Sequence, residues 1–148
     1  GDCERFMIQY GSYFWDIRTQ KLADPGGVVS VKSRRPLWWK PLVSERVLDD
    51  EHRQVIVPLF NPPAEEEVTG VTTVGPAEGV KVMFQLRKEE QVTAWLVGPE
   101  PVSHRRKLAT VPMRDRRLGV VVPRFWGWTN IVFDCRKNPS GDSVFGTD

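Results

Sequence analysis

The chain has 148 residues, of which 40% are hydrophobic and 27% charged, and its formal net charge is +2. A chain of this length makes about one domain and can bury a hydrophobic core, so its composition excludes wholesale disorder. No apolar run approaches the roughly 18 residues that a membrane-spanning helix needs, and the sequence therefore predicts no transmembrane segment.

The balance of apolar residues favours strands over helices. The sequence holds 21 Val against 9 Leu and 5 Ala, and β-branched residues favour strands. Its 12 Gly and 12 Pro are spread along the chain, where they break helices and end strands. Composition therefore predicts an all-β fold.

Short segments between turn signals predict about nine or ten strands, drawn from eleven candidate segments. In chain order they are residues 5–10, 12–18, 28–32, 37–43, 54–60, 68–74, 80–87, 92–97, 108–112, 118–122 and 124–135. Pro41 and Pro58 predict edge positions or irregular backbone for their strands. Residues 45–56 are the one segment that could hold a short helix, and residues 80–97 are expected to form a hairpin.

Many short strands with frequent turns are typical of a sandwich or a barrel. We predict a two-sheet antiparallel sandwich of the jelly-roll type, and a β-trefoil is the alternative. The expected organisation is a single all-β domain at residues 1–137, followed by a polar C-terminal tail at residues 138–148.

The two cysteines, Cys3 and Cys135, lie at opposite ends of the predicted domain. A disulfide between them would close a loop of roughly 130 residues and stabilise the fold by nearly 5 kcal/mol. Such a bridge predicts an extracellular, cell-surface or virion-surface location, whereas unpaired thiols would predict the cytoplasm. The cysteines lack Cys-x-x-Cys spacing and the two histidines are far apart, so no structural zinc site is expected.

Sequence motifs do not indicate catalysis. His52 and His104 lie in charged segments and are expected to be solvated, and no nucleophile motif accompanies them. Asp16 and Asp134 could serve as a pair of glycosidase carboxylates only if folding brought them together. The acidic run at residues 65–67 is expected to be a solvated loop rather than a calcium site. We therefore predict no catalytic residue, cofactor or metal.

Charge is unevenly distributed, with +5 on residues 101–148 and −3 on residues 1–100. Two predicted loops flank the strand at residues 108–112 and are expected to meet at one end of the sandwich. They carry Arg105, Arg106, Lys107, Arg114, Arg116 and Arg117. A patch of this kind would attract an acidic protein or an anionic glycan, or it could be a solvated rim. Aromatic residues are not interleaved with it, which argues against nucleic acid.

Adjacent strand residues face opposite sides, so one of Trp38 and Trp39 is expected outside the core. An exposed tryptophan is favoured at protein interfaces and on sugar-stacking platforms. The binding residues that we predict are these two tryptophans and the six basic residues above.

Together, these features predict a non-enzymatic, extracytoplasmic recognition domain that acts through protein–protein contacts. A structural domain of a virion or other assembly is one alternative. A small β-rich inhibitor that uses exposed loops is another.

Overall fold

The structure is a computed structural model that describes residues 5–6, 9–11, 18–63, 75–99 and 103–137. In these ranges the chain forms ten strands, helical backbone at residues 5–6 and 9–10, and two short 3-10 helices, η1 (Pro25–Gly27) and η2 (Lys40–Leu42). The strands are β1 (Thr19–Lys21), β2 (Val29–Lys32), β3 (Ser44–Asp49), β4 (His52–Phe60), β5 (Lys81–Gln85), β6 (Glu90–Gly98), β7 (His104–Leu108), β8 (Val111–Met113), β9 (Arg117–Val121) and β10 (Trp128–Lys137).

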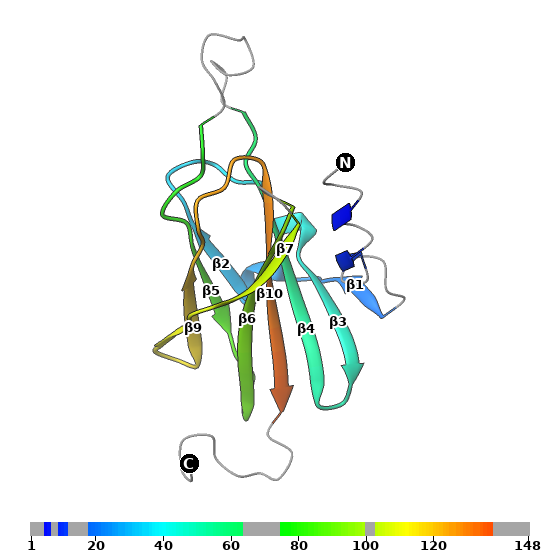
Figure 1. The fold of residues 1–148 in the computed structure, drawn as a ribbon. Helices are drawn as coiled ribbons and strands as arrows, with labels where there is room; N and C mark the ends of the chain where they lie inside the picture. Colours follow the sequence, from blue (N-terminus) through cyan, green and yellow to red (C-terminus); the bar gives the residue numbers. More distant parts are fainter. Residues whose placement is uncertain (1–4, 7–8, 12–17, 64–74, 100–102, 138–148) are drawn as a thin grey trace.

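The strands form two antiparallel sheets that pack face to face (Figure 1). Sheet A has six strands in the order β1-β3-β4-β10-β6-β7, and sheet B has four in the order β2-β5-β9-β8. This arrangement confirms the predicted two-sheet sandwich and is not a trefoil. Strands β7 and β8 follow one another along the chain and are edge strands of the two different sheets.

Alternation along the strands builds the core between the sheets. Ile131, Phe133 and Cys135 of β10 face inward, opposite Val82 and Phe84 of β5. The rings of Phe84 and Phe133 stack across the gap with centroids 4.3 Å apart. Aromatic stacking and apolar burial therefore join the centres of the two sheets.

Sheet A also buries residues on its outward side. Ile56, Val97 and Val132 point away from sheet B and are covered by Phe6, which is fully buried. The described residues between 5 and 10 are helical, so the predicted strand there is wrong. The reason is that Phe6 and Tyr10, four residues apart, share one helical face that packs on the sheet.

Two other sequence predictions fail because of long-range pairing. Residues 45–56 form most of a β3–β4 hairpin instead of a helix. The expected hairpin at residues 80–97 is also wrong, because β5 pairs with β2 and β9 whereas β6 pairs with β10 and β7. The segment between β5 and β6 therefore crosses from one sheet to the other. Residues 12–17, 68–74 and the tail at 138–148 lie outside the described residues.

Pro58 occurs in an interior strand, although its sequence predicted an edge. Phe60 exchanges backbone hydrogen bonds with Trp38, and Asn61 donates to Gly127 on the other side of β4. The backbone N–H and C=O groups of even-numbered β4 residues, including Pro58, therefore point away from β10 and toward the β3 side. On that side the pairing between β3 and β4 ends at Ser44, which lies opposite Ile56. Pro58 therefore has no β3 residue opposite it, and its missing N–H removes no hydrogen bond from the sheet.

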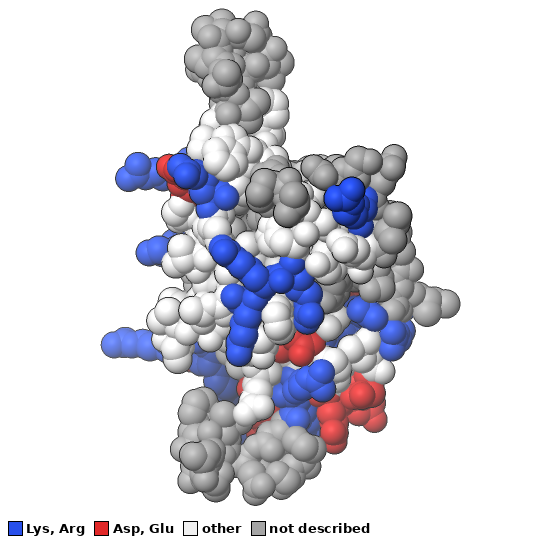
Figure 2. Space-filling model, viewed as in Figure 1, with Lys and Arg blue, Asp and Glu red and all other residues white. Residues whose placement is uncertain are grey.

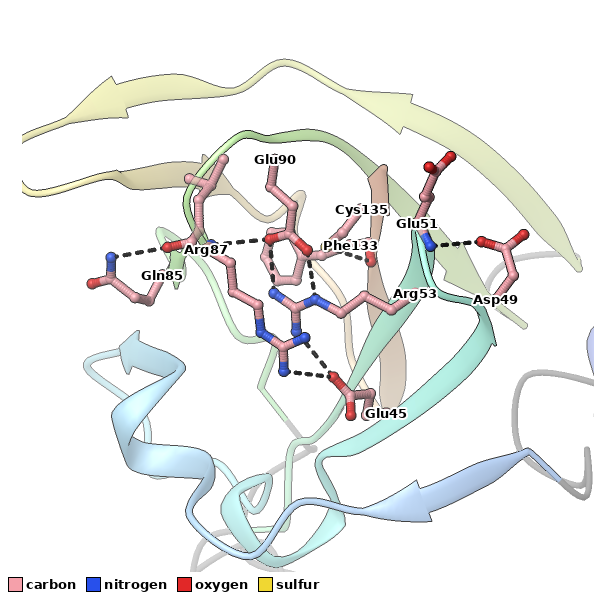
Figure 3. Close-up of polar contacts among 10 residues, drawn as sticks. Glu45, Asp49, Glu51, Arg53, Gln85, Arg87, Glu90, Phe133 and Cys135 are labelled. Atoms are coloured by element: carbon pink, nitrogen blue, oxygen red, sulfur yellow. Dashed lines mark hydrogen bonds and ion pairs between the residues drawn. The ribbon is translucent and has the colours of Figure 1, made fainter. Parts of the chain in front are cut away.

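A buried ion network closes one end of the sandwich (Figure 3). The Arg53 guanidinium donates two hydrogen bonds to Glu90, at 2.7 and 2.8 Å, and a third to Glu45 at 3.1 Å. It also lies 5.6 Å from the centre of the Phe84 ring in sheet B. Arg87, in the crossover from β5 to β6, donates its backbone N–H to Glu90 and its side chain to Glu45. The network therefore joins β3, β4, β6 and the crossover.

Cys135 lies beside this network as a free and fully buried thiol. Burial raises the pKa of Cys135 well above its usual range, which keeps the thiol protonated and unreactive. Its predicted partner, Cys3, lies outside the described residues. The structure therefore gives the disulfide no support, and the extracytoplasmic location that depended on it stays an untested prediction.

Neutralising Glu90 should change how stability depends on pH. Burial alone would raise the pKa of Glu90, but the hydrogen bonds from Arg53 and the Arg87 backbone lower it overall. The stabilisation is therefore fully present above the ordinary pKa of about 4.3 and is lost as pH falls through the lower folded value. Glu90→Gln should lower the free energy of unfolding by about 3 kcal/mol at neutral pH. It should also make the free energy of unfolding fall less steeply as the pH becomes acidic.

Urea unfolding measured across the acid range checks this prediction. Glu51→Gln changes an exposed carboxylate at the same end of the molecule and should follow the wild-type profile. The prediction would be contradicted if the free energies of unfolding of wild type and Glu90→Gln changed with pH in parallel.

Candidate functional site

The outward side of sheet A carries a row of aromatic side chains, which we call the aromatic face. It consists of Trp38, Phe60 of β4, Trp128 of β10 and Trp95 of β6. The rings of Trp38 and Phe60 lie 5.7 Å apart, and those of Phe60 and Trp128 stack at 5.5 Å with an angle of 6° between their planes. The rings of Trp38, Phe60 and Trp128 thus support one another, which fixes this part of the row before any partner binds.

The exposed end of the row is Trp38. This side chain is 55% exposed, whereas Trp39 is half-buried and packs against the core. The prediction that one of the two tryptophans lies outside the core is therefore confirmed. The prediction that they bind a partner remains a prediction.

Phe6 and Tyr10 of this chain pack on the centre of the aromatic face. The Phe6 ring meets Trp128 edge-on at 4.9 Å, and it packs with Tyr10 at 5.4 Å. Two aromatic residues on one helical face therefore already lie on the centre of this sheet surface. Trp38 extends beyond them at one side, and Trp95 lies on the other.

Asn61 fixes the backbone beside Trp38. Its side-chain amide donates to the carbonyl oxygens of Gly75 and Trp126, and its side-chain oxygen accepts a 2.6 Å hydrogen bond from Arg35. Trp126 is 48% exposed and lies 5.3 Å from the guanidinium of Arg124. A buried amide therefore holds the loop that presents a second exposed tryptophan.

Three of the six basic residues are not placed as the sequence predicted, whereas Arg114 and Arg116 do lie in a turn between two strands, as expected. Arg105, Arg106 and Lys107 lie on edge strand β7 rather than in a loop, and Arg105 packs 3.9 Å from the centre of the Trp95 ring. Trp38 is four strand spacings from β7, or about 19 Å. Charged side chains on an edge strand also oppose pairing with other chains, which is a structural role.

Arg114, Arg116 and Arg117 lie at the turn between β8 and β9, farther along the same open side of the sandwich (Figure 1). The two basic groups therefore follow one another along β7 and β8 and do not face each other at one end. Figure 2 shows Lys and Arg side chains over this side of the molecule, with acidic side chains gathered at the lower right, where the β3–β4 hairpin lies.

The β8–β9 turn is held in a strained conformation. Asp115 and Arg116 have φ angles of 60° and 54°. Aspartate tolerates this left-handed region, but a long side chain such as that of Arg116 rarely adopts it. The side-chain amide of Gln85 donates to the carbonyl oxygens of both residues, and the backbone N–H of Leu86 also donates to that of Arg116. The arginines of this turn are therefore displayed on a fixed backbone.

The fold brings His52 and Asp134 together, and it places His104 half-buried on β7. His52 is not solvated as predicted, because it is half-buried and its Nε2 lies 2.5 Å from Oδ1 of Asp134. Gln54 donates to the same carboxylate. Burial alone would raise the pKa of Asp134, but the hydrogen bonds with His52 and Gln54 lower it overall. Asp16 and the acidic run at residues 65–67 lie outside the described residues.

Among the described residues, no group of three or more His, Cys, Asp and Glu could hold a metal ion. The same residues contain no helix long and apolar enough to cross a membrane. A hollow of about 370 Å³ lies beside the ion network, between the β3–β4 hairpin and the start of β6. Its lining carries four acidic and four basic side chains, so it offers no preferred sign of charge to a ligand.

No protein-family model and no curated protein matches this sequence. Among solved structures, the chain is similar to a cycloisomaltooligosaccharide glucanotransferase of Paenibacillus sp., solved in complex with cycloisomaltoheptaose. The superposition has a TM-score of 0.64, covers 88% of this chain and shows 12% sequence identity. The match spans 20% of the length of that enzyme. At this identity the likeness concerns the fold.

Sequence reasoning missed most of the aromatic face. It named only Trp38 of the four members of this face, by expecting one of two adjacent tryptophans to lie outside the core. It could not place Phe60 beside Trp128, since that contact depends on the register between β4 and β10. The pairing of His52 with Asp134, 82 residues apart, depends on the same register.

The strain in the β8–β9 turn gives a stability prediction. Arg116→Gly should stabilise the fold by about 1 kcal/mol, because glycine adopts positive φ without a steric penalty. Arg114→Gly is the matched control, since Arg114 is in the same turn and its φ is not positive. The control should be neutral or slightly destabilising. Equal destabilisation by both substitutions in thermal unfolding would contradict the assignment of strain to Arg116.

Proposed function

We propose that this chain is a non-enzymatic recognition module that docks on a protein surface through the aromatic face of sheet A. The observation that carries the proposal is Trp38, an exposed tryptophan supported by the stacked rings of Phe60 and Trp128. A large ring held rigidly at the surface loses little conformational freedom on binding and can anchor an interface.

The preferred partner is a protein segment with closely spaced aromatic or apolar residues. Phe6 and Tyr10 support this choice, because they occupy the centre of the same face as a helical pair. A partner would extend that contact over Trp38 on one side or over Trp95 and Arg105 on the other. Arginine and tryptophan are both enriched where interfaces contribute most to affinity.

A glycan-binding module is the second candidate. The exposed Trp38 ring could stack on a sugar, and the structural neighbour is an enzyme that was solved with a cyclic glucan. The low identity and the coverage of only a fifth of that enzyme make this the weaker of the two proposals.

The test compares wild type with Trp38→Ala against two probes. The first is a displayed library of helical peptides whose apolar positions are varied, and the second is linear isomaltoheptaose. Peptides enriched on wild type should bind Trp38→Ala at least about tenfold more weakly, because the anchor ring is removed. Trp38→Ala should cost less than about 1 kcal/mol of stability, since the ring is largely exposed.

Val47→Ser changes an exposed apolar residue of β3 that is not part of the aromatic face, and as the control it should leave the binding of Trp38-dependent peptides unchanged. A library that yields no peptide whose affinity depends on Trp38 would contradict the proposal. Calorimetric binding of isomaltoheptaose that is lost in Trp38→Ala, without any Trp38-dependent peptide, would instead establish the glycan-binding alternative.

A further inference from the structure

The outward side of sheet B forms a second surface, on the far side of the sandwich from the aromatic face. The strand register places ten side chains or glycines on it: Ser30, Lys32, Lys81, Met83, Gln85, Val111, Met113, Arg117, Gly119 and Val121. Their inward-facing neighbours, such as Val82 and Val120, belong to the core. We call this set the sheet B face.

The centre of the sheet B face is apolar; its residues on β8 and β9 are exposed, whereas Met83 of β5 is buried. Met83, Gly119 and Val111 lie side by side across β5, β9 and β8. Val111 is 61% exposed, Val121 59% and Met113 43%. The solvent side of an antiparallel sheet is usually polar, so an uncovered apolar strip of this kind is typical of an interaction site.

All the charged residues of the sheet B face are basic. Lys32 and Lys81 lie at one end of the apolar strip and Arg117 at the other, and none of the ten positions is acidic. Arg114 and Arg116 extend the basic end into the rigid β8–β9 turn. A second copy of this chain would bring these cations against one another, so the face does not complement itself.

The edge beside this face is unsuited to pairing with another strand. Strand β8 has only three residues, and its central residue, Pro112, has no backbone N–H. A partner therefore gains more from covering the face than from extending the sheet. A Cβ at Gly119 would lie 3.3 Å from Sδ of Met113, so glycine allows the flexible Met113 side chain to lie close over β9.

We propose that the sheet B face docks an acidic protein partner that presents an apolar ridge flanked by carboxylates, such as an amphipathic helix. The ridge covers Val111, Val121 and Met113, and the carboxylates pair with Lys81 at one end and Arg117 at the other. This site goes beyond the proposed function, because it uses the opposite sheet and none of the aromatic residues.

The test uses a fluorescent synthetic peptide of about 18 residues, long enough to form a helix, with a leucine stripe flanked by glutamates. Val121→Ser should weaken its binding by about tenfold, and Lys81→Glu should weaken it and flatten its salt dependence. Both side chains are exposed, so unchanged thermal unfolding of the variants should show that the fold is intact. Trp38→Ala should bind like wild type, which separates this site from the aromatic face.

A peptide with lysine in place of each glutamate is the matched control and should not bind. Equal affinity of the glutamate peptide for wild type and Val121→Ser would overturn the proposal. It would also be overturned by a dimer in sedimentation that Val121→Ser dissociates. Val121-dependent binding to phosphatidylserine vesicles that is tighter than binding to the peptide would identify a membrane surface instead.

Discussion

The fold depends on one buried cation, the guanidinium of Arg53. Burying a charge is costly unless it is paired and hydrogen-bonded, and each of the three guanidinium nitrogens of Arg53 donates to Glu90 or Glu45. Glu90 begins β6, and its carboxylate also accepts the backbone N–H of Arg87 in the crossover. The ion network therefore fixes the point at which the chain leaves sheet B and enters sheet A, and the Arg53 guanidinium lies near Phe84 of sheet B.

This arrangement leaves the two outward faces of the sandwich with different surfaces. The core and the ion network hold the sheets together from within, so the outer residues are not needed for that purpose. Sheet A is aromatic and already carries Phe6, whereas sheet B is aliphatic and flanked by cations. A sandwich of this kind can present two independent docking surfaces on one rigid frame.

The sequence predicted features that depend on local alternation, and it failed where distant segments determine the outcome. The continuous apolar run from Val55 to Phe60 made β4 recognisable as a buried strand. Trp38 and Trp39 differ in exposure as expected, but the strand predicted at residues 37–43 is wrong, because residues 40–42 form η2. Adjacent strands β5 and β6 suggested a hairpin because nothing local shows that Glu90 pairs with Arg53, 37 residues earlier. The aromatic face and the sheet B face each need the register between strands, which no single segment contains.

A double-mutant cycle on Arg53 and Glu90 tests most directly whether the ion network organises the sandwich. Urea unfolding at neutral pH would compare wild type with Arg53→Met, Glu90→Met and the double variant. Each single substitution should cost about 3–5 kcal/mol, because it leaves the other charge buried and poorly paired. The double variant should cost at least about 2 kcal/mol less than the sum of the two singles. Additive losses would contradict the account, since they would mean that the two charges stabilise the fold independently.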